Sequence, residues 1–222
     1  SQDLGFLVDS VHIRDNLDLG PNVYRLTIHG VVMGEAELLP DRELAINPGQ
    51  VFGEVDGIPA KDPSFGLDAL WIDPSNRESA QTAGYTVVDC STVVATHLSQ
   101  ILKNNAAKLV GQDDVQQLLD RLKQNSPKLV ENLVPGVMSL ADVTRVIHSL
   151  LDEGVPIRDM RTIAETLSLQ RGSEKSPDEM VSQVRVALGP SIFQSVTGQA
   201  HELPVMVLDP QLELQLEFQL AL

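Results

Sequence analysis

One stretch of this sequence decides its fold: INPG at residues 46–49, VFGEVDGIPAKDPSFGLDALWIDP at 51–74 and GYTVVDCSTVVATHLSQILKNN at 84–105. Pro-Gly and Asp-Gly pairs and further prolines separate short β-rich runs, a pattern that predicts short strands joined by turns. After Asp89 the apolar residues recur every three or four positions, which predicts a helix capped by Asp89 or Ser91. The stretch therefore indicates an α+β fold.

Further strands and one short helix are expected in the N-terminal half. Runs that alternate in polarity or are rich in Val, Ile and Tyr predict strands, and Gly30 fits a turn between two of them. The polar run 76–83 predicts a short helix. The strands are expected at 11–14, 23–28, 31–38, 51–55, 70–73 and 85–88.

Capped amphipathic helices are expected from about residue 110 onward. Ser139 before Asp142 and Ser176 before Pro177 are helix-start signals, and Gly154 stands where a helix-ending glycine belongs. Apolar residues at helical spacing follow each signal. The helices are expected at 112–125, 158–169 and 176–188, and between Ser139 and Gly154.

The C-terminal residues give conflicting signals. Residues 203–208 predict a strand. Over 211–222 the leucines alternate with other residues, which predicts a strand, whereas Asp209-Pro210 before them is a helix-start signal. The residue pattern leaves helix and strand open there.

The expected fold class is α+β with several subdomains. Residues 1–40 and 90–109 are expected to form a first α/β subdomain, 41–89 a second small one, and 110–189 an all-α helical subdomain. Residues 190–222 are expected to begin a C-terminal α/β subdomain. Both ends of the chain fall abruptly inside patterned sequence, so we expect a piece of a longer polypeptide, with the first and last subdomains truncated.

The chain is strongly acidic, with a formal net charge of -15. Nucleic acid and anionic lipid attract clustered Lys and Arg, so neither is an expected partner. An acidic surface suits basic partners, and solubility alone also explains it. No window holds the roughly 18 apolar residues of a membrane span, and residues 1–20 lack a signal-peptide pattern.

No catalytic or metal-binding set is evident. The five histidines form no metal-ligand pair with one another or with Cys90, the single cysteine, so neither a metal nor a cofactor is expected. A helix N-terminus can lower the pKa of a thiol such as Cys90, but His97 lies about 10 Å along the same helix. A small buried Cys90 and a hydrogen-bonded His97 are favoured. The alternative is an α+β enzyme that uses both residues.

One loop stands out as a candidate binding element. Asp62-Pro63-Ser64-Phe65-Gly66-Leu67 places an aromatic residue in a Pro/Gly-rich segment, where it either folds into the core or lines a pocket. Together with Ile46 and Pro48, Phe65 could form a shallow apolar dimple rimmed by Asp62, a shape typical of hot-spot recognition. Both outcomes stay open at this point.

Six stretches carry a resemblance to known proteins: GEVDGIPAKDPSFGLDALWID (53–73), GYTVVDCSTVVATHL (84–98), QQLLDRL (116–122), PKLVENLVPGVMSL (127–140), GVPIRDMRTIAETL (154–167) and VRVALG (184–189). They are similar to the cytoplasmic region of the FlhA/LcrD/InvA family, the export-gate proteins of type III secretion. The resemblance covers nearly the whole chain, and GVPIRDMRTI is a specific signature. YTVVDCSTVVATHL resembles the flagellar branch, FlhA, and an injectisome homologue is the alternative within the family.

The resemblance implies a docking platform rather than an enzyme, with no cofactor. In that family the cytoplasmic region forms a nine-membered ring at the cytoplasmic face of the bacterial inner membrane, below a membrane-embedded part that would precede this chain. It implies flagellar export chaperones with cargo as partners, together with export ATPase complex components and other export-gate proteins. It also implies a helix after Asp209. By position, the chaperone-docking residues would be Ile46, Pro48, Asp62, Phe65, Val88 and Thr96.

Overall fold

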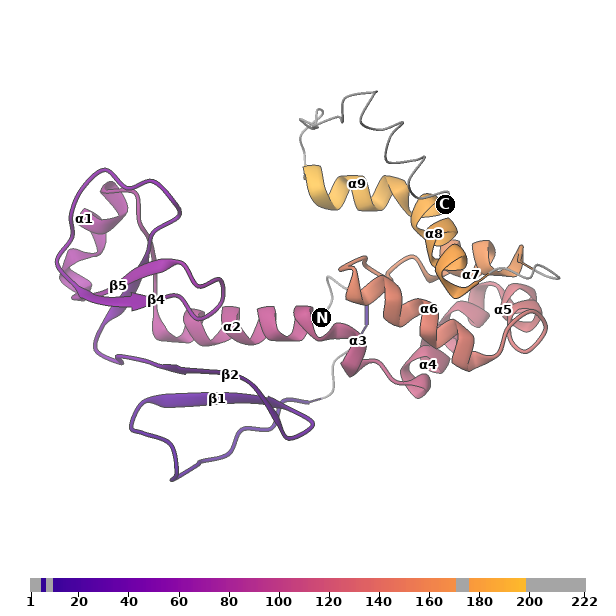
Figure 1. Cartoon of the computed structure of the whole chain (residues 1–222), viewed down its shortest axis with the longest axis horizontal. Helices are drawn as coiled ribbons and strands as arrows, with labels where there is room; N and C mark the ends of the chain where they lie inside the picture. The colour runs from indigo at the N-terminus through magenta and orange to yellow at the C-terminus, as the bar shows by residue number, and fades with distance from the viewer. Residues whose placement is uncertain (1–4, 7–9, 171–175, 199–222) are drawn as a thin grey trace, which may run out of the picture.

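The computed structural model describes residues 5–6, 10–170 and 176–198. It is elongated, with strands and a short helix at one end and packed helices at the other, and the long helix α2 (Cys90–Asn104) runs between them (Figure 1). All the strands in the described residues lie before Asp89. The fold is therefore α+β, as the sequence predicts.

A two-stranded hairpin opens the α/β half. Strand β1 (Val23–Ile28) pairs antiparallel with β2 (Val31–Glu37), with a bulge between Leu26 and Thr27. The two turn residues, His29 and Gly30, have φ of 50° and 80°. Positive φ at both positions gives the turn whose twist matches that of the two strands. The expected hairpin is therefore confirmed.

A second, four-stranded antiparallel sheet has the order β4-β5-β3-β6. Its strands are β3 (Glu43–Ile46), β4 (Ile58–Lys61), β5 (Asp68–Ile72) and β6 (Thr86–Val88). Helix α2 covers one face, where Leu44, Trp71 and Val93 share a buried apolar cluster. After the 3-10 turn η1 (Pro74–Asn76), helix α1 (Arg77–Thr82) covers the other face through Ala80. Successive residues of β3 thus point to opposite faces of the sheet, Leu44 toward α2 and Ala45 toward α1.

Helix α2 begins where the sequence predicts. The Asp89 carboxylate caps it by accepting a hydrogen bond from Thr92 N at 2.7 Å. One turn after another, Val93, His97 and Ile101 form its buried face. The buried face alternates with exposed positions, which is the amphipathic pattern of a helix lying on a sheet.

Helices and no strands make up the regular structure of the other half, within its described residues. Its centre is α6 (Leu140–Asp152), which buries the apolar residues Val143, Val146, Ile147, Leu150 and Leu151. Phe6 also contributes to this core. The helices are α3 (Ala106–Leu109), α4 (Gln112–Asn125), α5 (Pro127–Leu133), α6 (Leu140–Asp152), α7 (Met160–Ser168), α8 (Pro177–Ala187) and α9 (Gly189–Thr197).

Side-chain caps set the starts of three of these helices. Ser139 accepts from Asp142 N, Asp159 from Thr162 N, and Ser176 from the backbone N of Glu179. Such caps satisfy backbone N–H groups that the first helical turn leaves unpaired. The predicted cap at Ser139 and the predicted start at Ser176 are confirmed. Among the residues described, none of the helices combines the length and apolarity that crossing a bilayer requires.

Two predicted strands are wrong. Residues 11–14 and 51–55 belong to no strand, and both lack a partner strand. In the first run Ile13 is 92% exposed, and in the second Gly53 interrupts the run and Phe52 N donates to Ala83 O in a loop contact. A β-rich run without a partner cannot form a ladder, so composition alone misled the prediction.

Two strands were missed, β3 and β4. The sequence ELAI in β3 favours helix locally, and its strand form depends on pairing with β5 and β6 on either side. Pro59 lies inside β4, which is an edge strand, the position where a sheet tolerates proline. The predictions for 203–208 and 211–222 lie outside the described residues.

Candidate functional site

The loop 62–67, here called the Phe65 loop, connects β4 to β5 and is closed by its own hydrogen bonds. Asp62 Oδ2 accepts from Phe65 N, Asp62 O accepts from Gly66 N, and Asp62 N donates to Leu67 O, each at 2.8 Å. Gly66 has φ of 70°, a conformation that glycine adopts without strain. One buried carboxylate therefore holds the loop in a single tight shape.

The Phe65 side chain points away from the core, with 61% of its surface exposed. Of the two outcomes that the sequence left open for this residue, packing in the core is therefore wrong. Its neighbour Leu67 is also an exposed large apolar residue. Apolar side chains held outward by an ordered loop can meet a partner without first ordering the loop.

Asp62 differs from its expected place at an exposed rim. Its side chain is only 3% exposed, and one carboxylate oxygen is engaged by the Phe65 amide. The reason is that the loop needs an acceptor for that inward N–H group. Asp62 therefore shapes the loop from within.

The remaining expected docking residues lie on the elements beside this loop. Ile46 on β3 and Val88 on β6 are partly buried and pack against the apolar cluster between the sheet and α2. Pro48 is exposed just after β3, and Thr96 is half-buried on α2. Of these four residues, Ile46 and Val88 thus pack inward, whereas Pro48 and Thr96 keep part of their surface exposed.

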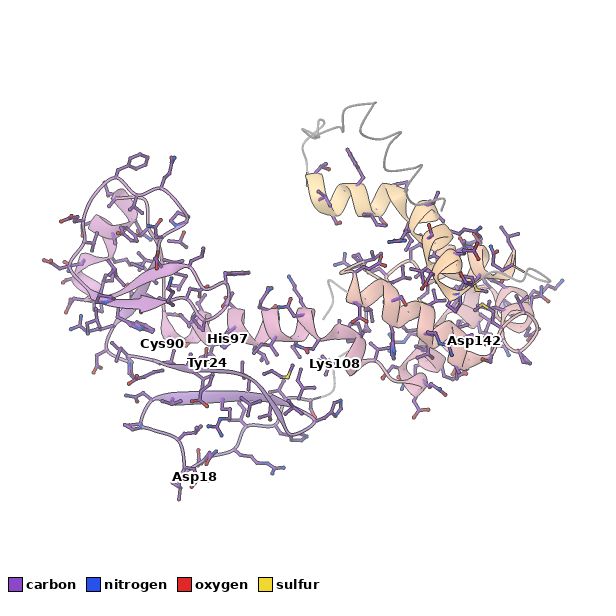
Figure 2. All side chains as sticks on the ribbon, viewed as in Figure 1. Asp18, Tyr24, Cys90, His97, Lys108 and Asp142 are labelled. Carbon is purple, nitrogen blue, oxygen red and sulfur yellow. The ribbon has the colours of Figure 1, made fainter. Side chains whose placement is uncertain are left out.

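A partly buried polar pair joins strand β1 to helix α2. The Tyr24 hydroxyl is 2.8 Å from His97 Nδ1, and the two rings meet edge to face at 74° (Figure 2). Burial raises the pKa of Tyr24 to about 12, with the Asp62 carboxylate adding to the shift. Burial lowers the pKa of His97, and Asp62 opposes that shift. Burial is the larger cause of both shifts, and the negative charge of Asp62 favours the neutral tyrosine and the protonated histidine.

The surroundings of His97 and Cys90 can be compared with the roles that the sequence favoured for them. His97 is buried and hydrogen-bonded, as favoured from the sequence. Cys90 lies with Sγ 3.4 Å from Leu39 O, and burial together with Asp89 raises the pKa of its thiol. A reactive cysteine needs the opposite shift. Tyr24 was missed by sequence reasoning, because an alternating strand residue gives no sign of a polar partner.

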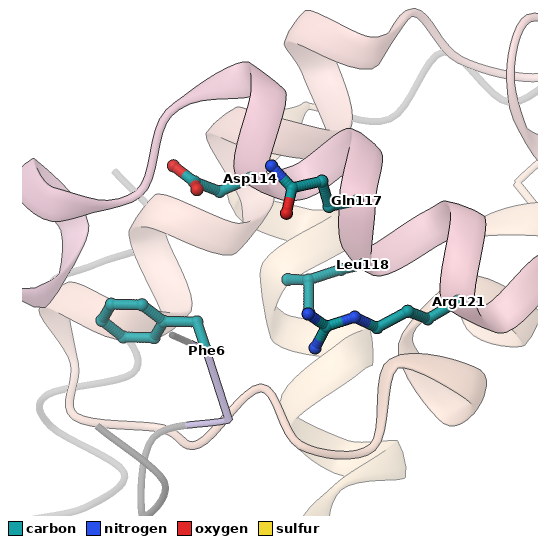
Figure 3. Close-up of a pocket in the computed structure, with 5 residues that line it drawn as sticks. All are labelled: Phe6, Asp114, Gln117, Leu118 and Arg121. Carbon is teal, nitrogen blue, oxygen red and sulfur yellow. The ribbon is translucent and has the colours of Figure 1, made fainter. Parts of the chain in front are cut away.

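Two hollows differ in size and lie in different halves of the described chain. One is lined by Phe6, Asp114, Gln117, Leu118 and Arg121 and measures about 20 Å³, enough for one water molecule (Figure 3). An open hollow of about 270 Å³ lies beside Pro59, Asp68 and Tyr85. Among the described residues no group of three His, Cys, Asp or Glu side chains could hold a metal ion.

The fold is that of the cytosolic domains of type III secretion export-gate proteins. The Chlamydia pneumoniae CdsV protein matches with a TM-score of 0.83 and 22% identity over 97% of this chain and 62% of that one. CdsV in its complex with CdsO matches with a TM-score of 0.82 and 21% identity, over 98% and 66%. The nonameric EscV cytosolic domain matches with a TM-score of 0.59 and 20% identity, over 82% and 54%.

The chain belongs to the FHIPEP family, whose model matches residues 1–221. The flagellar biosynthesis protein FlhA of Escherichia coli (strain K12) is 50% identical over 213 residues, and that of Salmonella typhimurium (strain LT2) is 49% identical over 213 residues. Each alignment covers 96% of this chain and 31% of the relative. The chain thus spans about a third of the length of these curated relatives.

Proposed function

We propose that this chain is a non-catalytic docking platform of the flagellar type III export gate, which receives export chaperones with their cargo. The observation that carries the proposal is Phe65, which is 61% exposed on a loop fixed by the buried Asp62. The flagellar FlhA relatives support a role in flagellar export, because they are about 50% identical to the chain in sequence. The injectisome proteins named above share the fold at about 20% identity.

A preformed apolar anchor is what such a surface needs. Hot spots are apolar or aromatic side chains that insert into a partner's pocket, and an anchor that is already ordered costs less entropy on binding. Phe65 would supply that anchor, Thr96 and Pro48 its neighbouring contacts, and Ile46 and Val88 the support beneath. Asp62 would hold the anchor in place.

The proposed place in the export gate also implies a ring assembly and further protein partners. In the whole protein we propose a nine-membered ring at the cytoplasmic face of the inner membrane, anchored by a part outside this chain. Export ATPase complex components and other export-gate proteins are its proposed further partners. The nonameric EscV and the CdsV complex with CdsO support ring formation and partner binding as properties of this fold.

The test is the affinity of the chain for a purified flagellar chaperone–cargo complex. We expect Phe65→Ala to weaken binding about 30-fold, the loss typical of a truncated aromatic anchor of about 2 kcal/mol. The melting temperature should stay close to that of the wild type, because an exposed side chain supports little core. Phe52→Ala is the matched control, since Phe52 is 85% exposed on a different loop.

Three results would contradict the proposal. The first is unchanged affinity in folded Phe65→Ala, the second is an equal loss in Phe52→Ala, and the third is a large drop in melting temperature. A core phenylalanine would instead lower stability by about 3–5 kcal/mol when truncated.

A further inference from the structure

The face of the four-stranded sheet that carries α1 is only partly covered by this helix. Helix α1 packs against β3 and β6, and its Ala80 belongs to the same buried cluster as Ala45 and Val87. The helix has six residues and is about 9 Å long. It lies over these two strands rather than over β4 and the Asp68 end of β5.

The register of the strands shows which side chains lie on the uncovered part of this face. Ala45 pairs with Leu70 on one side and with Val87 on the other. Leu70 in turn pairs with Pro59 on β4. Residues that pair directly across antiparallel strands point to the same face of the sheet. Leu70 and Pro59 therefore lie on the face that carries α1, beside the helix.

The open hollow of about 270 Å³ lies over this part of the sheet. It is here called the Leu70 hollow, and its lining includes Asn47, Pro59, Asp68, Leu70 and Tyr85. Leu70 and Tyr85 are partly buried and pack against the buried cluster beneath α1. Asp68 lies two residues before Leu70 on the same strand and so shares its face. The hollow thus has apolar walls and an acidic residue at one end.

The size and place of the Leu70 hollow favour a protein side chain as its occupant. Small-molecule pockets usually measure about 300–1,000 Å³ and enclose most of their ligand, whereas this hollow is smaller and open. An added strand is disfavoured, because Pro59 on the edge strand β4 has no N–H group to donate. Sheet faces are commonly covered by helices. A partner helix beside α1 would complete that layer.

The charges around the hollow favour a basic partner. Residues 41–89 contain nine acidic and three basic side chains. The Asp68 side chain is 80% exposed, and its Oδ1 atom lies 2.8 Å from Lys61 Nζ, which is also exposed. Such a surface ion pair contributes little free energy, so a cation of the partner can replace Lys61. A second copy of this acidic chain would be repelled.

We propose that the Leu70 hollow binds a basic amphipathic helix of a partner protein. An apolar side chain of that helix would insert between Leu70 and Tyr85, and a Lys or Arg would lie beside Asp68. Ile46 and Val88 pack on the opposite face of the sheet, toward α2. This binding is therefore separate from the docking proposed for Phe65.

The probe for the test is a peptide of about 18 residues, with leucine and lysine placed at the spacing of an amphipathic helix. The same peptide with glutamate in place of lysine is its control. Nuclear magnetic resonance spectra of the chain are recorded as each peptide is added. The lysine peptide should shift the backbone amides of residues 60–61, 68–70 and 85. The glutamate peptide should leave these amides unchanged.

Three charge variants test the role of Asp68 in binding the lysine peptide. Asp68→Lys should weaken binding about fivefold or more, because it places like charges side by side. Asp120→Lys is the matched control, since it makes the same change at an exposed position of α4, and should alter the affinity less than about twofold. Lys61→Gln should strengthen binding, because it frees the Asp68 carboxylate.

Two further variants test the apolar contact. Leu70→Ala should weaken binding of the lysine peptide about fivefold or more, as for a truncated anchor. Phe65→Ala should leave this affinity unchanged, because Phe65 belongs to the other surface. If Leu70→Ala fails to fold, the variants of Asp68 and Lys61, both at exposed positions, decide.

Four results would overturn the proposal. They are equal affinity for the two peptides, equal losses in Asp68→Lys and Asp120→Lys, amide shifts that lie outside the hollow, and loss of peptide binding in folded Phe65→Ala. Hollow amides that shift with the concentration of the chain alone would identify a second copy as the occupant and would also contradict it.

Discussion

Asp62 and Phe65 stand three residues apart and have opposite exposures, 3% and 61%. Both were expected on one recognition surface, but only the aromatic side chain faces outward. The carboxylate acts from inside by accepting the Phe65 amide. Substitution of either residue should therefore weaken docking, through loss of the anchor in one case and through a loosened loop in the other.

The neutral His97 ring should make folding stability depend on pH. Burial lowers its pKa in the folded chain below the ordinary value of 6.5, so the unfolded chain takes up the proton first. The stability linked to the neutral ring is fully present above about pH 6.5 and is lost as the pH falls toward the folded pKa. Urea unfolding of wild type at about pH 7.5 and about pH 5.5 should show this loss. His97→Gln should reduce it, and an identical loss in both chains would contradict this origin.

Cys90 should tolerate truncation to a smaller residue. Its thiol lies 3.4 Å from a backbone carbonyl and has a raised pKa, while His97 is engaged by Tyr24. We expect Cys90→Ala in the full-length protein to support export at nearly the wild-type level. Secretion of flagellar cargo by cells that carry this variant is the measurement. Loss of export with normal protein abundance would revive the enzyme alternative.

At the scale of elements, side-chain caps fix where the helices of this chain begin. Asp159 caps α7 by accepting from Thr162 N at 3.0 Å and from Thr162 Oγ1 at 2.6 Å. These bonds hold the first turn in place, and a carboxylate there also suits the helix dipole. The caps explain why the helical half could be anticipated from short sequence signals.

Asp159→Ala should lower the free energy of unfolding by about 1 kcal/mol, the usual loss for an N-cap residue. Asp178→Ala is the control, because Asp178 lies in the first turn of α8, whose cap is Ser176. It should cost distinctly less. Chemical denaturation of the two variants compares them, and equal losses would show that the cap bond contributes little.

The strands were anticipated less well than the helices, for a physical reason. A helix such as α4 carries its apolar stripe within its own residues, and its predicted bounds 112–125 match. Strand β3 depends on partners that are distant in sequence, such as Trp71 and Val88. Likewise, the sequence indicated Phe65 as a candidate binding residue. It gave no sign of the Tyr24–His97 pair, because that pair forms only when β1 meets α2.

At the scale of the whole molecule, two halves are connected by α2 and by a second link. Phe6, near the N-terminus, is 4% exposed and packs into the core of the helical half, while the hairpin that follows lies in the α/β half. We propose the division into 1–40 with 90–109, 41–89, 110–189 and the part from 190 onward. In this division the Phe65 loop belongs to the small subdomain, whereas α2 and β1 belong to the neighbouring subdomain.

The most direct test of the docking role is site-specific photo-crosslinking in the full-length protein in cells. A photoreactive phenylalanine analogue in place of Phe65 reports what touches that side chain during export, and the same analogue in place of Phe52 is the matched control. The docking account predicts a crosslink to a flagellar export chaperone from position 65 and none from position 52. Chaperone crosslinks from position 52 alone, or none from position 65 in cells that export normally, would contradict it.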